Sequence, residues 1–303
     1  MKVRTNGIET NYTLEGPAGA PVVTLSHSLA TDLSMWEPQM AALRARYRVL
    51  NYDTRGHGGT DVPATAYTLD QLADDARALL QALGIARTHW VGLSMGGMIG
   101  QTLALEHPEL FASLSLCDTS SRIPGEAKPL WADRIKTAET QGMEPLVEPT
   151  LARWLTAPFR ERRKDVVDKV ATMIRSTPPK GYAGCCHAIA ALDLTDRISA
   201  ISLPTFIIVG EEDQGTPVAA SKVMNERIKG SQLVILPSAA HLSNLEQPQA
   251  FTDALLGFLN KNSSSCRGER GKFLTVLAAG SILGRTSGPA PSHQCSRRSA
   301  WQR

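Results

Sequence analysis

The stretch THWVGLSMGG, residues 88–97, decides the fold. Its first residues favour a β-strand, and residues 95–106 have a helical pattern that a proline ends. A serine between strand and helix, in the pattern Gly-x-Ser-x-Gly, is typical of a sharp turn in which side chains in place of Gly92 and Gly96 would clash with their neighbours. Such a turn exposes the Ser94 hydroxyl and points the first amide of the helix at the atom that the hydroxyl attacks. The stretch therefore predicts a nucleophilic serine.

Strand-like and helix-like segments alternate on both sides of this turn. The expected strands are residues 2–5, 8–14, 21–26, 48–52, 88–91, 114–117, 205–209 and 233–236. The expected helices are residues 36–47, 68–84, 95–106, 217–228 and 248–259. Asn6-Gly7 between the first two strands predicts a hairpin. Strands that alternate with helices predict an α/β fold, with a mostly parallel, twisted sheet flanked by helices.

Two regions depart from this alternation. Residues 123–192 are rich in proline, Arg and Lys and predict a helical insertion that caps the core, so we expect residues 1–122 and 193–260 to form the core domain. Residues 261–303 are rich in Ser, Gly and Arg without a sustained period. We expect this basic tail to be disordered.

Composition excludes several classes of function. The chain has 303 residues, of which 42% are hydrophobic, enough for one large core with an insertion. Its net charge is +3, but residues 261–303 carry +7, which leaves −4 for residues 1–260 and no basic face for nucleic acid. No signal segment is visible, and the apolar residues 273–283 are too few to span a bilayer. The five cysteines, odd in number and without CxxC spacing, favour a reduced, cytoplasmic setting.

A nucleophilic serine needs a base and an acid that orients the base. In a sheet of this kind the acid and then the histidine follow the serine in the chain, on loops after later strands. His241 follows the last expected strand and is the predicted base. Glu211, Glu212 and Asp213 follow the strand before it, and we favour Asp213, which lies deepest in the loop and precedes a Gly-x-Pro turn.

The reaction also needs two backbone N–H donors for the oxyanion. The amide of Met95 is the first. The second should come from the loop after residues 21–26, where we favour the amide of Leu29, with Ser28 as the alternative. His27 we expect to hold that loop in place.

Asp53, Arg55 and His57 also carry polar side chains in a glycine-rich loop after a strand. A guanidinium can tie neighbouring loops by fork-shaped hydrogen bonds. We therefore interpret this group as structural.

Several stretches resemble the α/β-hydrolase superfamily. They are DTRGHGGTD (53–61), GLSMGG (92–97), GEEDQGTP (210–217) and AAHLSNLEQP (239–248). More narrowly, the chain resembles the 3-oxoadipate enol-lactonases over residues 1–260. The stretches that carry this resemblance are SHSLATDLSMWEPQM (26–40), CDTSSRIPGEAKPLWADRIKTAETQGM (117–143), RWLTAPFR (153–160) and GYAGCCHAIAALD (181–193).

The resemblance implies an α/β-hydrolase fold with a helical cap. It implies that Ser94, Asp213 and His241 form the catalytic triad and that the amides of Leu29 and Met95 form the oxyanion hole. The implied reaction is the opening of 3-oxoadipate enol-lactone to 3-oxoadipate through an acyl-enzyme, in aromatic catabolism. It needs no cofactor, and the His and Cys residues show no metal-ligand spacing.

The implied substrate carries a carboxylate, so the cap should supply a cation. Arg134, which follows Trp131 at helical spacing, is our first candidate, and Arg153 beside Trp154 is the next. The alternatives that keep the triad are a broad carboxylesterase or lactonase and a cofactor-free perhydrolase. A binding module with a dead site is disfavoured by the complete triad, and a haloalkane dehalogenase by the serine where that chemistry needs a carboxylate.

Overall fold

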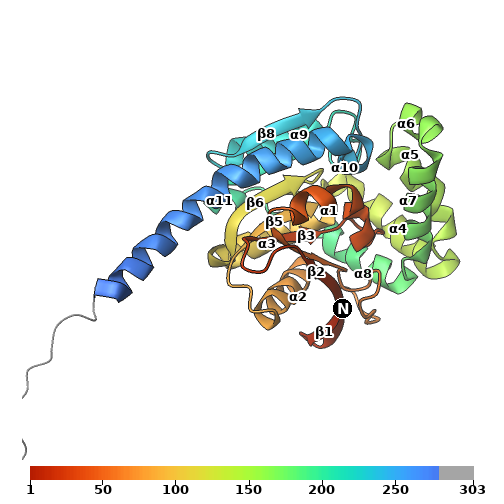
Figure 1. Ribbon diagram of the computed structural model, residues 1–303. Helices are drawn as coiled ribbons and strands as arrows, with labels where there is room; N and C mark the ends of the chain where they lie inside the picture. The colour runs from red at the N-terminus through yellow and green to blue at the C-terminus, as the bar shows by residue number, and fades with distance from the viewer. Residues whose placement is uncertain (280–303) are drawn as a thin grey trace, which may run out of the picture. The chain divides into compact units, whose positions relative to one another are not determined.

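The computed structural model describes residues 1–279, with side chains as far as residue 263. Within them the chain forms one eight-stranded sheet, in the order β1-β2-β4-β3-β5-β6-β7-β8 (Figure 1). The strands are β1 (Lys2–Thr5), β2 (Ile8–Glu15), β3 (Val22–Ser26), β4 (Arg48–Tyr52), β5 (Thr88–Leu93), β6 (Phe111–Cys117), β7 (Thr205–Gly210) and β8 (Gln232–Leu236). The pairs β1–β2 and β2–β4 are antiparallel and the other pairs are parallel, which confirms the predicted mostly parallel sheet.

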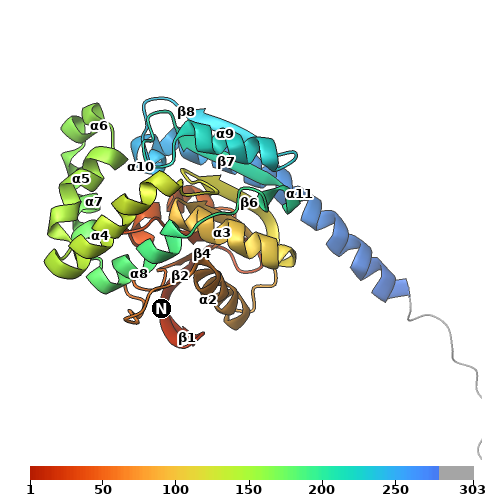
Figure 2. The same cartoon turned by 180° about the vertical axis from the view of Figure 1, so that it is seen from behind.

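Helices cover both faces of this sheet. The helices outside the insertion are α1 (Glu37–Arg44), α2 (Leu69–Ala82), α3 (Met95–Glu106), α9 (Val218–Arg227), α10 (Ser243–Glu246) and α11 (Pro248–Ala279), with short 3-10 turns η1 (Leu33–Trp36), η2 (Pro108–Leu110) and η4 (Ile198–Ala200). Helix α1 and the part of α11 up to residue 263 lie over one face (Figure 1), and α2, α3 and α9 lie over the other (Figure 2). Because both faces are covered, β5, β6 and β7 are buried at every residue.

Local signals in the sequence explain most boundaries. Thr68 caps α2, since its hydroxyl accepts a hydrogen bond of 3.1 Å from the Gln71 amide, and Gly84 follows the helix with φ +67°. The helix expected over residues 36–47 is instead divided into η1 and α1. The Asp32 side chain caps η1 by accepting from the Ser34 amide at 2.8 Å, and Pro38 lies in the first turn of α1.

The insertion between β6 and β7 is helical. It contains η3 (Gly125–Ala127), α4 (Lys128–Gln141), α5 (Glu144–Trp154), α6 (Ala157–Arg162), α7 (Lys164–Ser176) and α8 (Pro179–Ala190). Its two ends meet at an isolated bridge between Arg122 and Asp193, next to a 3.0 Å hydrogen bond from the Ile123 amide to the Leu192 carbonyl. This closed base lets the insertion sit as a cap beside the carboxyl ends of the strands.

The last helix is longer than expected. Residues Met1–Ser263 form one compact unit and residue Ser264 begins a second. We expected disorder over residues 261–303, but α11 continues to Ala279, and no proline follows Pro248 within it. The remainder of that expectation lies outside the described residues. No described helix is long and apolar enough to cross a bilayer.

A buried ion pair joins the loop after β4 to α2. The guanidinium of Arg55 donates to both carboxylate oxygens of Asp75, at 2.6 and 2.7 Å, and both side chains are less than 8% exposed. Asn6 in the hairpin turn adds a 2.6 Å hydrogen bond to the same carboxylate. Arg55 is therefore structural, as its sequence context predicted.

We predict that Arg55→Met, which leaves Asp75 buried without its cation, lowers the free energy of unfolding by about 3–5 kcal/mol. The double variant Arg55→Met/Asp75→Leu should recover most of this loss, because it leaves no unpaired charge. Urea denaturation of both variants measures the difference. Equal stability of the single and the double variant would contradict this assignment.

Candidate active site

The backbone of Ser94 is held in an unfavourable conformation. Its φ of 52° and ψ of −111° lie outside the regions that a serine normally adopts, at a cost of about 1–3 kcal/mol. The close approach of the chain explains the two glycines that flank it. A Cβ on Gly92 would overlap the Gly96 backbone, and a Cβ on Gly96 would overlap the Ser26 carbonyl. The strand-to-helix turn predicted from the sequence is therefore present between β5 and α3.

His241 and Asp213 are paired on the loops that follow β8 and β7. The Nδ1 atom of His241 lies 2.8 Å from Oδ2 of Asp213, and both residues are buried. Because the carboxylate can only accept, Nδ1 carries the hydrogen and Nε2 is free to act as a base. Glu211 and Glu212, the other two candidates for the acid, are exposed.

Three further hydrogen bonds stabilise the Asp213 carboxylate. Its Oδ1 accepts from the amides of Gly215 and Thr216 at 2.8 and 2.9 Å, and Oδ2 accepts from the Thr216 hydroxyl at 2.7 Å. Burial by itself raises the pKa of Asp213, but the neighbouring His241 and the hydrogen bonds from Thr216 outweigh burial and lower the pKa. The carboxylate therefore stays charged and able to stabilise a protonated imidazole.

The loop after β3 is clamped at one peptide group. The Ser28 carbonyl accepts from His27 Nδ1 at 2.7 Å and from the Thr31 hydroxyl at 2.8 Å. In a trans peptide the C=O and N–H groups point in opposite directions. Holding the Ser28 carbonyl therefore fixes the direction of the Leu29 N–H, which belongs to the same peptide group.

The neighbouring amides of this loop are already engaged. The Ser28 N–H donates to Met35 Sδ at 3.3 Å, and the Ala30 N–H donates to His57 Nε2 at 3.0 Å. The Leu29 N–H has no hydrogen-bond partner among the described residues. These contacts favour Leu29 over Ser28 as the available donor of the loop.

The amide of Met95 begins α3. As the first helical residue it has no carbonyl four residues earlier within the helix to bond, and the positive end of the helix dipole adds to its donor strength. Met95 and Leu29 follow β5 and β3, which are adjacent in the sheet. Their amides can therefore serve one oxyanion.

Cap residues reach the base. The ring centroid of Trp154 lies 5.7 Å from that of His241, and the Leu242 amide donates to the Trp154 carbonyl at 3.1 Å. In α4 the Arg134 guanidinium lies 4.6 Å from the Trp131 ring centroid. The structure therefore places Trp154 directly against His241, and it pairs Trp131 with Arg134.

Glu246 is a buried residue that the sequence did not single out. Its Oε1 accepts from the Thr156 amide and hydroxyl at 2.9 and 2.7 Å, and its Oε2 accepts from the Ala240 amide at 2.6 Å. Thr156 belongs to the cap and Ala240 precedes His241. The position of Glu246 five residues after His241, within AAHLSNLEQP, was the signal available in the sequence.

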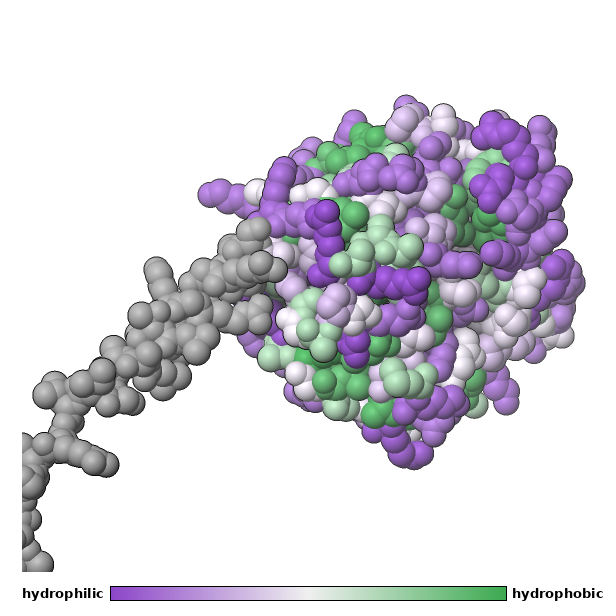
Figure 3. Space-filling view, viewed as in Figure 1, coloured by the Kyte–Doolittle hydropathy of each residue, from purple (hydrophilic) through white to green (hydrophobic). Residues whose placement is uncertain are grey.

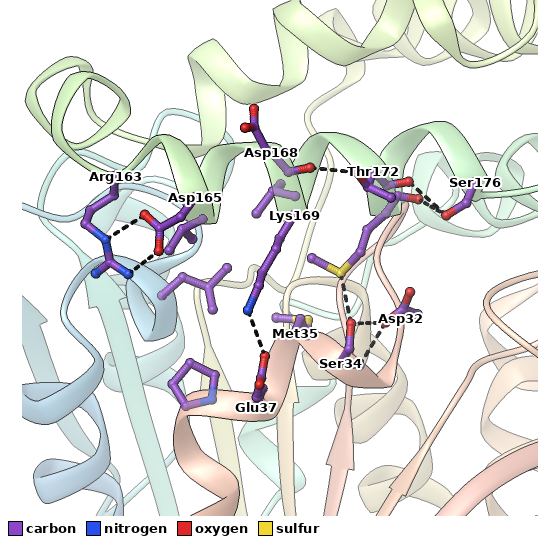
Figure 4. Close-up of a pocket in the computed structure, with 15 residues that line it drawn as sticks. Asp32, Ser34, Met35, Glu37, Arg163, Asp165, Asp168, Lys169, Thr172 and Ser176 are labelled. Carbon is purple, nitrogen blue, oxygen red and sulfur yellow. Dashed lines mark hydrogen bonds and ion pairs between the residues drawn. The ribbon is translucent and has the colours of Figure 1, made fainter.

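A cleft of about 770 Å³ separates α7 from η1 and α1 (Figure 4). Lys169 and Glu37 form an ion pair of 3.3 Å across it, and the Ser34 hydroxyl contacts Met173 Sδ at 3.5 Å. The carboxylates in its lining outnumber the cations; they are Asp32, Glu37, Asp165 and Asp168 against Arg163 and Lys169. No triad residue lines this cleft, and its charge disfavours an anionic ligand.

Two other features of the described part of the chain are relevant to ligands. Its His, Cys, Asp and Glu side chains form no group of three or more that could hold a metal ion. On the face drawn in Figure 3 the surface is mainly hydrophilic, with apolar residues in small separate groups.

Comparison with known proteins agrees with the fold. Residues 21–248 match the α/β-hydrolase fold family. The chain is 39% identical to 3-oxoadipate enol-lactonase 2 of Acinetobacter baylyi over 248 residues, 82% of this chain and 92% of the relative. The crystal structure of the enol-lactonase from Burkholderia xenovorans LB400 is 39% identical, with a TM-score of 0.83 over 86% of this chain and 100% of that one.

A thermophilic esterase from Thermogutta terrifontis, solved with malate bound, is 31% identical, with a TM-score of 0.82 over 87% of this chain and 98% of that one. The chain belongs to the α/β-hydrolase family, and within it to the 3-oxoadipate enol-lactonase group of carboxylic ester hydrolases.

The two ring nitrogens of His27 make separable contacts: Nδ1 donates to the Ser28 carbonyl, and Nε2 accepts from the Thr54 amide at 2.9 Å. His27→Asn keeps a donor near Nδ1, whereas His27→Gln keeps an acceptor near Nε2. We predict that the Gln variant lowers kcat about 10–100-fold at a similar KM, because the oxyanion donor is misdirected, and that the Asn variant loses much less. Steady-state kinetics compares them; equal losses in both variants would contradict the clamp.

Burial, together with the charge of His27, lowers the pKa of His57 to about 3, from an ordinary value of 6.5. Between pH 6.5 and about pH 3, His57 binds a proton in the unfolded chain but not in the folded chain. The free energy of unfolding therefore falls as the pH falls through this range. We predict that His57→Gln, which keeps an acceptor for Ala30, makes this dependence shallower by up to about 1.4 kcal/mol per pH unit. Urea denaturation between pH 7 and pH 5 tests this, and an unchanged slope would refute it.

Proposed function

We propose that the chain is a serine hydrolase that opens 3-oxoadipate enol-lactone to 3-oxoadipate through an acyl-enzyme. Ser94 is the nucleophile, His241 is the base and Asp213 orients the imidazole. The amides of Leu29 and Met95 stabilise the oxyanion. This reaction would place the protein in the β-ketoadipate pathway of aromatic catabolism, in the cytoplasm.

The acylation step opens the lactone ring. The Ser94 oxygen attacks the ring carbonyl while His241 Nε2 takes the hydroxyl proton, and Asp213 stabilises the resulting imidazolium. The two amides bind the oxyanion of the tetrahedral intermediate, and one such donor is typically worth about 10²–10³ in rate. The bond between the carbonyl carbon and the ring oxygen then breaks. The leaving enolate stays attached to the acyl chain and takes its proton from His241.

Deacylation uses the same groups, but here water is the nucleophile and the Ser94 oxygen is the leaving group. A water molecule attacks the acyl carbon as His241 takes its proton, and the Ser94 oxygen leaves and is protonated by His241. The freed product is an enol with two carboxylates, which tautomerises to the ketone. Apart from this water molecule, the chain's own residues supply every group that the two steps need.

Arg134 and Arg153 in the cap carry the argument for a carboxylated substrate. Neither guanidinium has a carboxylate partner among the described residues. Burial and the charge of Arg134 lower the pKa of Arg153 to about 10, and the charge of Asp213 acts on Arg153 in the opposite direction. Two cations that repel each other near the triad acid form a site that an anion would stabilise.

The neighbours agree with this substrate class. The relatives named 3-oxoadipate enol-lactonase are 36–39% identical, and the esterase from Thermogutta terrifontis was solved with malate, a dicarboxylate. We propose that Trp131 and Trp154 form apolar walls beside the lactone and that Arg134, with Arg153, binds its carboxylate.

Hydrolysis of the enol-lactone beside a panel of uncharged lactones and aryl esters tests the proposal. The expected kcat/KM for the enol-lactone is at least about 100-fold above that for uncharged esters. Uncharged esters have no carboxylate to pair with a cap arginine and therefore lose that contribution to binding. A preference for uncharged esters would favour the alternative, a broad carboxylesterase, for which the 31% identical esterase is the supporting neighbour. Perhydrolase activity would appear as peracid formation from a carboxylic acid and hydrogen peroxide.

We predict that Arg134→Ala raises KM for the enol-lactone about 10–100-fold and leaves the KM of an uncharged aryl ester unchanged, because only the first substrate loses an ionic partner. The matched control is Arg175→Ala, which removes the same charge from an exposed cap arginine that pairs with Glu144 at 2.8 Å. The control should change neither KM. An unchanged KM for the enol-lactone in Arg134→Ala would remove Arg134 from the site.

A further inference from the structure

The loop after β6 contacts the loops that carry all three triad residues. The Ser94 amide donates to the Cys117 carbonyl at 2.9 Å, and the Thr119 hydroxyl donates to the Ser94 carbonyl at 2.7 Å. Asp118 lies between them. Its Oδ1 accepts from the Gly210 amide at 2.8 Å, and its Oδ2 lies 2.6 Å from the Ser243 hydroxyl.

These two partners of Asp118 belong to different catalytic loops. Gly210 ends β7 and begins the loop of Asp213, and Ser243 follows His241 by two residues. Asp118 is fully buried and has a φ of 43°, a left-handed conformation that Asp and Asn tolerate better than most residues. Its side chain is not the partner of the imidazole, since His241 Nδ1 bonds Asp213 instead.

We propose that Asp118 is a positioning residue whose carboxyl group holds the loop of the triad acid at a fixed distance from the loop of the triad base. This inference rests on the proposed function of Ser94, Asp213 and His241. Each oxygen of the carboxyl group makes one of the two contacts: Oδ1 accepts from the Gly210 amide, and Oδ2 accepts from the Ser243 hydroxyl.

The electrostatics of the site agree with a neutral Asp118. Burial raises the pKa of Asp118 well above its ordinary value, and the negative charge of Asp213 raises it further. Only one of two neighbouring buried carboxyls readily carries a charge. The chain thus keeps the charge on Asp213, where the imidazole needs it, and uses Asp118 as a hydrogen-bonding spacer.

Three variants test this role. Asp118→Asn keeps one acceptor and one donor in a neutral side chain of the same shape, and it tolerates the same φ. Asp118→Gly removes both contacts without backbone strain. Ser243→Ala removes only the contact to the base loop. Ser115→Ala is the control, because the Ser115 hydroxyl is buried on β6, the strand that ends just before Asp118, and has no hydrogen-bond partner among the described residues.

The measurement is the rate at which a fluorophosphonate labels Ser94 in the folded full-length protein, together with kcat and KM for an ester. In labelling, the Ser94 oxygen bonds to phosphorus and fluoride leaves, so the rate reports the activated serine whatever the true substrate. We expect labelling and kcat to fall at least about tenfold in Asp118→Gly and about two- to tenfold in Ser243→Ala, with similar KM. Asp118→Asn should keep most of the parent rate, and the control all of it.

Parent-like labelling in Ser243→Ala overturns the inference, whether or not Asp118→Gly folds. Equal losses in Asp118→Asn and Asp118→Gly overturn the neutral state of Asp118. A parent that is not labelled at Ser94 overturns the proposed function itself and the inference with it, so the two failures are distinguishable.

Discussion

The backbone of Ser94, fixed in a conformation that serine rarely adopts, is the constraint on which the structure depends. It requires glycine on both sides, because Gly92 and Gly96 contact backbone where a Cβ would overlap. It also requires β3 beside β5, since Gly96 packs against the carbonyl of Ser26. That adjacency brings the loop after β3 next to the start of α3. The strained turn and the closeness of the two amides that we propose bind the oxyanion are therefore consequences of one packing arrangement.

Buried polar groups hold the surroundings of this turn. His27 and His57 engage the carbonyl and amide groups on either side of Leu29 and leave its N–H available. Glu246 joins the loop of His241 to the cap, and Trp154 of the cap packs against the imidazole. The cap thus contacts His241 directly, besides holding the arginines that we propose bind a carboxylated substrate.

Much of this arrangement could be predicted from short-range patterns. The period of apolar residues and the caps at Thr68 and Gly84 located α2, and the Gly-x-Ser-x-Gly pattern located the turn at Ser94. The chain order of strands and loops was enough to select His241 and to favour Asp213, which the structure pairs at 2.8 Å.

Other features depend on contacts between residues far apart in the sequence. Asp118 and Glu246 bond groups in other loops, at separations of up to 125 residues, and the motif that contains Glu246 does not identify its partner in the cap. Residues 33–44 divide into η1 and α1, because Asp32 caps the first and Pro38 lies in the first turn of the second. The period of apolar residues alone does not show where one helix ends and the next begins. The period of apolar residues also did not predict the length of α11, whose residues after 260 continue the helix without a sustained apolar pattern.

The central claim, that Ser94 forms a covalent acyl intermediate, is tested most directly by mass spectrometry of the protein mixed with a slowly hydrolysed ester and quenched within one turnover. The account predicts a mass increase equal to the acyl group, located on the peptide that contains Ser94, absent in Ser94→Ala and lost as product forms. Full hydrolytic turnover in Ser94→Ala, or an adduct on another residue, would contradict it.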